Sequence, residues 1–582
     1  MKQLMSGNEA IAQGAWEAGC FGGFGYPGTP SSEILEALAV LPEVYAEWAP
    51  NEKVALESAI GASLAGARAL VTMKHVGVNV AADPLMTLSY TGVTGGLVIV
   101  AADDPGMHSS QNEQDSRNYA KFARVPMLDP ADAQEALDMT KFAFELSEQF
   151  DTAVFIRPTM RISHTESVVE IHERKVLEQK AYEKDASKWV MMPAFAIKRR
   201  PLVDKRMDEL TQFVETSPFN KLELRDTKIG FICSGAVFQH AREALPEASS
   251  LKLGFSWPLP QRLIQEFFDA VEKVYVLDEA DQFFLHEIQA LGFKPESFPY
   301  PLKSTGELSP RAIREALGLH LDQTAFAPIG NLPARPPALC PACPHRLVFF
   351  ELRRMRAVVT GDIGCYTLGA LPPLSVQDSV VCMGASVSMA HGFELAKPKD
   401  HNRPVFGLIG DSTFAHSGIV SLINTYYNGG SGNIIILDNR TTGMTGGQGN
   451  PVNGITLQNR ASHELKLIPL IKGIGIEHVV EVPSGDQKAI RNALKESVNR
   501  ADELCVTIVK GPCVVEYKVK GVQREVIQEL CTKCGICSTL GCPAIGRSFD
   551  GYAFIDETQC MGCTHCEQIC SFGAIKAVRG EL

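Results

Sequence analysis

Short apolar runs rich in Val and Ile recur along the chain and alternate with stretches of helical periodicity. Runs of this length between helices are typical of buried strands in parallel sheets, so the pattern predicts an α/β fold. The predicted strands comprise residues 69–73, 96–104, 152–158, 228–235, 273–281, 404–411 and 433–439.

Two helices near the amino terminus carry start signals. Ser6 and Glu9 have the spacing of a capping box ahead of an apolar stretch, which predicts a helix from this point. Pro30 is predicted to be the first residue of a second helix, in "TPSSEILEALAVL", because proline is well suited to the first helical position.

Two segments interrupt the pattern and divide the chain into four predicted domains. Residues 166–225 are charged and lack strand periodicity, which predicts a linker or an irregular segment. The proline-rich stretch 327–345 is predicted to separate two large units. The predicted domains comprise residues 1–165, 226–322, 338–522 and 526–582.

Composition narrows the class of protein. At 582 residues the chain is too long for one hydrophobic core, and its net charge of −12 argues against nucleic acids and anionic membranes as partners. The start lacks a basic stretch followed by an apolar run, and no apolar run reaches the roughly 20 residues that span a bilayer. We therefore expect a soluble, cytoplasmic protein whose sixteen cysteines serve metal or redox chemistry rather than disulfides.

Eight of these cysteines lie in the last predicted domain. Their two C-x2-C-x2-C runs, each followed by a fourth cysteine, are close to the two-cluster bacterial ferredoxin motif, although the first run has one extra residue and Ser571 replaces a proline. Zinc sites also use C-x2-C pairs, but the triple run is rare among them. Because each ferredoxin cluster takes its fourth ligand from the other motif, we predict one 4Fe–4S cluster on Cys531, Cys534, Cys537 and Cys570 and one on Cys560, Cys563, Cys566 and Cys542.

Oxygen-bearing side chains follow two neighbouring predicted strands. Asp411 ends the strand at 404–411 and Asn439 ends the strand at 433–439, with room for one helix between them. The carboxyl ends of parallel strands meet at one edge of a sheet, where such folds bind ligands. Asp411, Asn439 and the main-chain carbonyl of Thr441 are therefore candidate ligands of a Mg2+ ion.

The surrounding stretch resembles the GDG…N signature with which thiamine diphosphate enzymes hold the Mg2+ and diphosphate of their cofactor. Ser412 replaces the last glycine of the signature. Taken alone, these residues also fit an acidic turn in an ordinary βαβ unit. The resemblance implies that the cofactor is bound by Gly410, Asp411, Ser412, Asn439, Thr441, Gly443, Met444 and Thr445.

A thiamine site also needs a glutamate that activates the aminopyrimidine ring of the cofactor. The candidates are Glu52 and Glu57, near the start of a predicted helix. Gly61 follows Glu52 by nine residues, a spacing similar to that of the activating glutamate in this superfamily, so we choose Glu52. Its alternative role is to stabilise the helix start through the helix dipole.

The stretch "GYPGTPSSEILEAL" resembles the substrate loop of 2-oxoacid:ferredoxin oxidoreductases. The resemblance implies that the Thr29 hydroxyl binds the substrate carboxylate; otherwise Thr29 is an ordinary helix cap. Gly23, Gly25 and Gly28 also match a dinucleotide-binding motif. We reject that motif because a helix rather than a strand is predicted before it and because Pro27 lies within it.

Over essentially its whole length, the chain resembles the alpha subunits of indolepyruvate:ferredoxin oxidoreductases. The resemblance is carried by residues 73–117, 340–346, 361–369 and 442–448 and by the cysteine tail. It implies a smaller beta subunit as partner, in a larger heteromer. The implied domains are a pyrimidine-binding domain at 1–165, a transketolase C-terminal-like domain at 226–322, a diphosphate-binding domain at 338–522 and a two-cluster ferredoxin-like domain at 526–582.

Related oxidoreductases hold a further cluster near thiamine through a CxxC pair and two later cysteines. By this resemblance, a third 4Fe–4S cluster is expected on Cys340, Cys343, Cys365 and Cys513. The alternative is a structural CxxC pair, with Cys513 as a small buried apolar residue. That buried apolar role is the one predicted for Cys20, Cys233, Cys382 and Cys505.

Two histidines, His75 and His108, flank the presumed substrate region. Because histidine titrates near neutral pH, either could orient or protonate a reaction intermediate. A structural hydrogen-bonding role fits each of them equally well.

The resemblance implies oxidative decarboxylation of an aromatic 2-oxo acid, with the acyl group transferred to coenzyme A and the electrons passed through the clusters to ferredoxin. One alternative is a thiamine-dependent decarboxylase that releases an aldehyde, and another is an oxidoreductase for a different 2-oxo acid. A third is an electron-transfer subunit with vestigial thiamine domains. The complete cysteine tail argues against the decarboxylase, and the pairing of Glu52 with Asp411 and Asn439 argues against the electron-transfer subunit.

Overall fold

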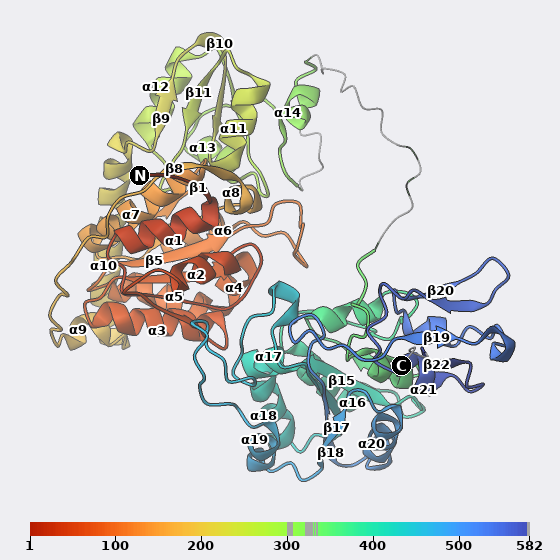
Figure 1. Cartoon of the computed structure of the whole chain (residues 1–582). Helices are drawn as coiled ribbons and strands as arrows, with labels where there is room; N and C mark the ends of the chain where they lie inside the picture. Colours follow the sequence, from red (N-terminus) through yellow and green to blue (C-terminus); the bar gives the residue numbers. More distant parts are fainter. Residues whose placement is uncertain (300–305, 320–329, 331, 333–335, 579–582) are drawn as a thin grey trace. The chain divides into compact units, whose positions relative to one another are not determined.

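The computed structural model describes residues 1–299, 306–319, 330, 332 and 336–578. The chain forms two compact units, the N-terminal unit (Met1–Pro328) and the C-terminal unit (Ile329–Leu582) (Figure 1). Each contains a largely parallel sheet covered by helices, as the hydrophobic pattern predicts. None of the described helices is long and apolar enough to cross a membrane.

The N-terminal unit is built on a seven-stranded sheet with strand order β12-β6-β7-β5-β4-β2-β3. Every neighbouring pair is parallel except β12 and β6. Strands β4 and β5 are buried along all six residues, which explains their near-continuous apolar sequences. The strands are β2 (Gly22–Gly25), β3 (Tyr45–Trp48), β4 (Ala69–Lys74), β5 (Leu97–Ala102), β6 (Met127–Leu128), β7 (Val154–Ile156) and β12 (Phe255–Trp257).

Helices connect these strands, and the first of them begins as predicted. The capping box of Ser6 and Glu9 is confirmed, because each residue's main-chain N–H donates to the other's side chain. The second helix begins at Ser32, so the prediction that it starts at Pro30 is wrong: Pro30 lies in a turn closed by a hydrogen bond from Ser31 N–H to the Gly28 carbonyl. The helices are α1 (Gly7–Glu17), α2 (Ser32–Ala39), α3 (Glu52–Leu64), α4 (His75–Val80), α5 (Ala82–Thr91), α6 (Ser116–Ala123), α7 (Ala133–Phe150) and α8 (Met160–His164).

The segment predicted to be a linker or irregular, residues 166–225, contains regular structure. Its strand β8 (Glu166–Glu170) pairs antiparallel with β1 (Lys2–Ser6), and its long helix α10 (Pro193–Phe213) follows the short helix α9 (Ala186–Trp189). The sequence pattern does not predict α10, because the helix contains an internal proline and buries only Val203, Arg206 and Leu210. A helix with so narrow a buried stripe has little hydrophobic periodicity.

A smaller four-stranded sheet completes the N-terminal unit, with order β13-β10-β11-β9. A buried ionic junction joins it to the first sheet: the Arg117 guanidinium bonds Asp115 at 2.5 Å and Asp278 at 2.8 Å. The elements are β9 (Lys221–Glu223), β10 (Asp226–Cys233), β11 (Ala248–Lys252), β13 (Lys273–Val276), α11 (Gly235–Ala244), α12 (Gln261–Ala270), α13 (Phe283–Ala290) and α14 (Pro310–Ala316).

The C-terminal unit is built on a five-stranded parallel sheet with order β14-β15-β16-β18-β17. Both faces are covered: Leu408 and Ile435 face one apolar cluster, whereas Ile409 and Ile434 face another. The strands are β14 (Val358–Thr360), β15 (Val405–Gly410), β16 (Gly432–Asp438), β17 (Val479–Pro483) and β18 (Leu504–Lys510). The helices are α15 (Arg346–Arg354), α16 (Ala385–Ala396), α17 (Asp411–Thr413), α18 (Ile419–Tyr427), α19 (Leu467–Ile474) and α20 (Gln487–Asn499).

The cysteine-rich tail packs against this sheet domain. Its residues Leu540, Ile569 and Ile575 share one buried apolar cluster with Phe349 and Leu352 of α15. The tail contains short strands and a single-turn helix: β19 (Arg524–Val526), β20 (Ile545–Arg547), β21 (Ala553–Ile555), α21 (His565–Ile569) and β22 (Ile575–Ala577). All seven strands predicted from the sequence are confirmed, as β4, β5, β7, β10, β13, β15 and β16.

Candidate functional site

The structure brings Asp411 and Asn439 together at the carboxyl ends of neighbouring strands. Strands β15 and β16 are parallel, with Gly410 opposite Leu437 in the register. Asp411 follows β15 directly and is the first residue of α17, so the helix expected between the two strands begins immediately after β15 and continues through a π-helical turn (Phe414–Gly418) into α18. Asn439 follows the last residue of β16.

One end of the Asn439 side-chain amide lies 3.0 Å from Asp411 Oδ1 and 2.9 Å from the Thr441 carbonyl oxygen. With its nitrogen at this position, the amide donates to both oxygens. With its oxygen there, that oxygen lies about 3 Å from each of the other two, close to the separation of neighbouring oxygen ligands around Mg2+. The donor set therefore fits a hard cation after a simple turn of one amide.

The buried position of Asp411 raises the pKa of its carboxyl to about 8, with a smaller contribution from the neighbouring carboxylate of Asp438. Its hydrogen-bond donors are the main-chain N–H of Ser412 at 2.9 Å and the Asn450 side-chain amide at 3.4 Å. The guanidinium of Arg440 lies 3.7 Å from Asp438. A cation bound at Asp411 would compensate the buried negative charge.

The loop that follows Asn439 also lies beside Asp411 and Ser412. Gly443–Thr445 forms a 3-10 turn, and Thr445 Oγ1 donates to the Gln448 side chain at 2.6 Å. The hydroxyl of Ser412 accepts a hydrogen bond from Thr442 at 2.9 Å, so the residue that departs from the GDG signature ties this loop to α17. Met444 is about half exposed at the rim of the turn.

In the N-terminal unit, Glu52 is buried, with 5% of its surface exposed, at the first position of α3. The Asn51 side chain caps this helix by accepting from Val54 N–H at 2.9 Å. Gly77, in the first turn of α4, lies so close that a Cβ atom there would be 2.7 Å from Glu52 Oε1. Glu57, the other candidate, is exposed and pairs with Lys53, so the structure favours Glu52.

Thr29 lies in the loop between β2 and α2, beside the end of β4. A Cβ atom at Gly28 would lie 3.2 Å from Lys74 Cβ, which makes the two segments neighbours. Lys74 is the last residue of β4; its ammonium donates to the Ser109 carbonyl, and burial lowers its pKa to about 8. Lys74 was not predicted from the sequence, because its buried environment arises only in the folded chain.

The two candidate histidines occupy different environments. His75 is buried at the start of α4, and its Nε2 lies 3.2 Å from Ser110 Oγ, which in turn donates to Asp104. Burial lowers the pKa of His75, so the ring is neutral near pH 7. His108 is exposed and its Nε2 lies 3.4 Å from Glu307, while its main-chain N–H donates to Asp104, the same carboxylate that accepts from Ser110.

The glycines of the rejected dinucleotide motif pack a helix against a strand. Gly23 and Gly25 belong to strand β2, which follows helix α1, so the motif begins within a strand that was not predicted. A Cβ atom at Gly23 would lie 2.5 Å from Leu35 and Leu38 of α2. The absence of side chains at these glycines lets α2 approach the sheet closely.

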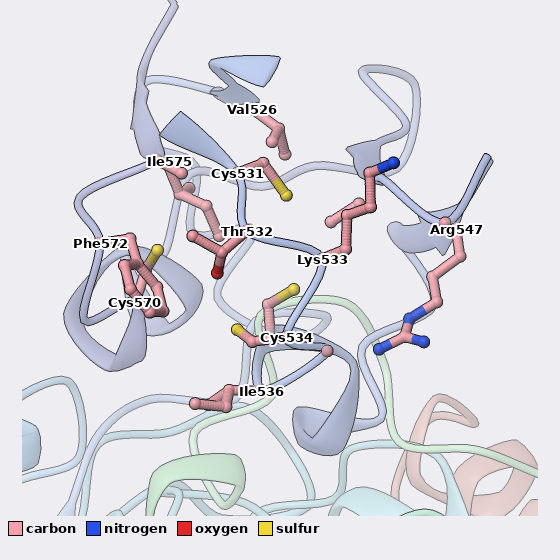
Figure 2. Close-up of a pocket in the computed structure, with 15 residues that line it drawn as sticks. Val526, Cys531, Thr532, Lys533, Cys534, Ile536, Arg547, Cys570, Phe572 and Ile575 are labelled. Atoms are coloured by element: carbon pink, nitrogen blue, oxygen red, sulfur yellow. The ribbon is translucent and has the colours of Figure 1, made fainter. Parts of the chain in front are cut away.

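The tail contains two cavities, each lined by four cysteines from both motifs. Figure 2 shows the first cavity, where Cys531 and Cys534 come from one loop and Cys570 comes from the end of α21. No three His, Cys, Asp or Glu side chains in the described ranges are spaced to hold one metal ion, whereas a cubane binds each thiolate to a separate iron. The first cavity is lined by Cys531, Cys534, Cys537 and Cys570, and the second by Cys542, Cys560, Cys563 and Cys566.

A third group of cysteines lies beside the Asp411 site. Burial raises the pKa of the Cys343 thiol to about 12 and that of Cys365 to about 11, and the neighbouring Cys340 and Cys513 contribute to these shifts. The main-chain N–H of Cys513 donates to the Asn439 carbonyl at 3.0 Å. A Cβ atom at Gly443 would lie 3.5 Å from Cys365 Sγ.

Of the four cysteines expected to be buried apolar residues, three are buried: Cys20, Cys233 and Cys505. The prediction is wrong for Cys382, which is exposed in a loop before α16. A single cysteine in a segment without periodicity carries no signal of its burial.

Two protein-family models match the chain. Residues 13–217 match "Pyruvate flavodoxin/ferredoxin oxidoreductase, thiamine diP-bdg", and residues 362–516 match "Thiamine pyrophosphate enzyme, C-terminal TPP binding domain". Among solved structures, 2-oxoglutarate:ferredoxin oxidoreductase from Magnetococcus marinus is similar over 55% of this chain and 65% of that chain, at 18% identity and a TM-score of 0.45, too low to add to the argument.

Curated relatives match over nearly their full length. Indolepyruvate oxidoreductase subunit IorA of Pyrococcus horikoshii is 37% identical over 100% of this chain and 98% of its own. The subunit of the same name from Methanothermobacter marburgensis is 40% identical over 98% of this chain and 97% of its own. The chain therefore belongs to the IorA family of indolepyruvate oxidoreductase subunits.

Proposed function

We propose that this chain catalyses the oxidative decarboxylation of an aromatic 2-oxo acid such as indolepyruvate. The products are CO2, the aryl-acetyl thioester of coenzyme A and two electrons for ferredoxin. The observation that carries the proposal is the hydrogen bond from Cys513 N–H to the Asn439 carbonyl, at 3.0 Å. Through this bond, a group of four cysteines lies next to the residues proposed to bind the cofactor's diphosphate. A cluster on these cysteines could therefore accept the electrons that the reaction releases.

Thiamine diphosphate, when bound, supplies a carbon nucleophile and a ring that accepts the electron pair released with CO2. Glu52 is proposed to hold the proton on the aminopyrimidine ring that makes this nucleophile available. Asp411, Asn439 and the Thr441 carbonyl would hold the Mg2+ of the diphosphate. Two observations support these roles. The carboxyls of Glu52 and Asp411 are buried, and the side-chain amide of Asn439 lies close to oxygens of Asp411 and Thr441.

The substrate would be held by groups at the carboxyl ends of β2 and β4. Thr29 is proposed to donate its hydroxyl to the substrate carboxylate. The neutral His75 holds or moves a proton, with its Nε2 oriented through Ser110 and Asp104. His108 is left out of this set because it is exposed and paired with Glu307.

The cysteines are proposed to bind three 4Fe–4S clusters, two in the tail cavities and one on Cys340, Cys343, Cys365 and Cys513. Support comes from the lining of each tail cavity by four cysteines drawn from both motifs, as in ferredoxins. The further partners are a smaller beta subunit, in a larger heteromer, and ferredoxin as electron acceptor. Coenzyme A is the second substrate.

The test uses the anaerobically purified protein with its beta subunit, thiamine diphosphate, Mg2+ and indolepyruvate, with and without coenzyme A. We expect the visible iron–sulfur absorbance to bleach only when the oxo acid is present, while the Glu52→Gln variant keeps its iron and does not bleach. Release of CO2 and aldehyde without bleaching would contradict the proposal and favour a simple decarboxylase. Bleaching with aliphatic but not aryl oxo acids would reassign the substrate.

A further inference from the structure

Arg346, the first residue of α15, carries a positive charge into the interior of the C-terminal unit. Only 1% of the residue is exposed. Its guanidinium donates to the carbonyl oxygens of Leu540 at 2.6 Å, of Cys340 at 2.8 Å and of Leu339. Its Nε has no hydrogen-bond partner among the described residues.

These partners are all neutral main-chain groups. Within the part of the chain that the structure describes, no carboxylate lies within ion-pair distance of Arg346. The buried arginines of the N-terminal unit differ, because Arg117 contacts Asp115 and Asp278, and Arg157 contacts Asp103 at 2.6 Å. A buried cation without a counter-charge is strongly unfavourable, so a negative group is missing from the surroundings of Arg346.

The surroundings of Arg346 show where that negative group belongs. Arg346 lines the tail cavity that contains Cys542, Cys560, Cys563 and Cys566. A 4Fe–4S cluster on four thiolates has a net negative charge, which increases by one when the cluster accepts an electron.

We propose that Arg346 is the counter-charge of the cluster held by Cys542, Cys560, Cys563 and Cys566, and that it raises the reduction potential of this cluster. The inference rests on the proposed function. The step concerned is electron transfer between two clusters. The cluster beside Arg346 gains one electron, the reduced cluster on the third cysteine group loses one, and no proton is transferred. A fixed buried cation favours the product of this step because the accepting cluster becomes more negative.

The test is an anaerobic redox titration of the complete heteromer, followed by electron paramagnetic resonance, with iron content measured on the same samples. We expect Arg346→Gln to lower the equilibrium constant for reduction of one cluster by tenfold or more, which is 59 mV for one electron. The cluster of the first tail cavity, whose lining does not include Arg346, keeps its potential. Arg346→Lys retains the charge and restores most of the shift.

Arg547 provides a matched control, because it lines the other tail cavity but is exposed. Solvent screens an exposed charge, so Arg547→Gln should shift the neighbouring cluster much less than Arg346→Gln shifts its own. Equal shifts in the two variants would contradict the proposal.

Two further results would overturn it. The first is an Arg346→Gln protein with full iron content and unchanged potentials. The second is loss of iron in both the Gln and the Lys variants, which would assign Arg346 to folding through its three carbonyl bonds. The proposed function fails separately, if the wild-type heteromer does not bleach with a 2-oxo acid.

Discussion

Single side chains set the geometry around Glu52. Gly77 lies against its carboxyl, and the absence of a side chain at this position leaves room for the glutamate in its buried orientation. Gly77 has no left-handed backbone angle, so its conformation alone does not require glycine. Glycine is therefore needed at position 77 for steric reasons, because it leaves room for the Glu52 carboxyl, which is proposed to activate the cofactor.

Gly77→Ala is predicted to lower turnover about 100-fold, because the added Cβ would lie 2.7 Å from Glu52 Oε1 and must displace the carboxyl. Iron content and thermal stability should change little, since alanine favours the helix. The assay is steady-state turnover with iron analysis. Gly392→Ala in α16 is the control, because no atom lies within 4 Å of its Cβ position, and it should keep full activity. An active Gly77→Ala enzyme would speak against Glu52 as the activating residue.

The sequence identifies residues whose signal is local and misses those whose role arises through folding. Glu52, Asp411 and Asn439 stand at recognisable spacings from strands and glycines, and the structure buries all three. Arg346 and Lys74 look like ordinary helix and strand residues in the sequence. Only the folded chain shows that each is a buried cation that donates to main-chain carbonyl oxygens, one for Lys74 and three for Arg346.

Secondary-structure elements were predictable where burial gives them a strong pattern. The fully buried strands β4, β5 and β15 were predicted, whereas β3 and β17, which are partly exposed, and α10, which buries three residues, were not. Contacts between elements that are distant in the chain could not be predicted from the sequence either. Arg117 comes from α6 and Asp278 follows β13, more than 160 positions away, so their contact leaves no trace in the local pattern.

The junction between the two sheets of the N-terminal unit is predicted to depend on pH through Glu279. Burial raises the pKa of this carboxyl from 4.5 to about 7. Between these values the folded protein keeps a proton that the unfolded chain releases, so stability falls as pH rises, by roughly 3 kcal/mol in all. Glu279→Gln can still accept the bond from Leu308 N–H.

Thermal unfolding at two pH values measures this effect. The Gln variant should have a higher Tm than the wild type at pH 8 and no advantage at pH 5, where the wild-type carboxyl is protonated in the fold. The same difference at both pH values would show that the effect is one of packing rather than of charge.

Across the chain, the proposed site residues divide between the two units. Glu52 belongs to the N-terminal unit, and Asp411, Asn439 and the cysteines belong to the C-terminal unit. Activation of the cofactor and binding of its diphosphate should therefore be separable by mutation.

Asp411→Asn is predicted to weaken binding of Mg2+ and thiamine diphosphate at least 100-fold, because it removes the charged oxygen ligand. Glu52→Gln should bind the cofactor within about threefold of wild type and yet be inactive, since the proton-holding group is lost. Calorimetric titration of the iron-replete heteromer tests both. If Glu52→Gln loses the cofactor as completely as Asp411→Asn, the division of roles is wrong.

The two tail cavities differ in a way that bears on handling the protein in air. Cys534 in the first cavity is exposed, whereas Cys566 in the second is buried. Thiolate oxidation follows exposure, so molecular oxygen would damage the first site before the second. A preparation aged in air would still split CO2 from its substrate but lose its route to ferredoxin. It would then release aldehyde, so an oxidised sample could be mistaken for a simple decarboxylase.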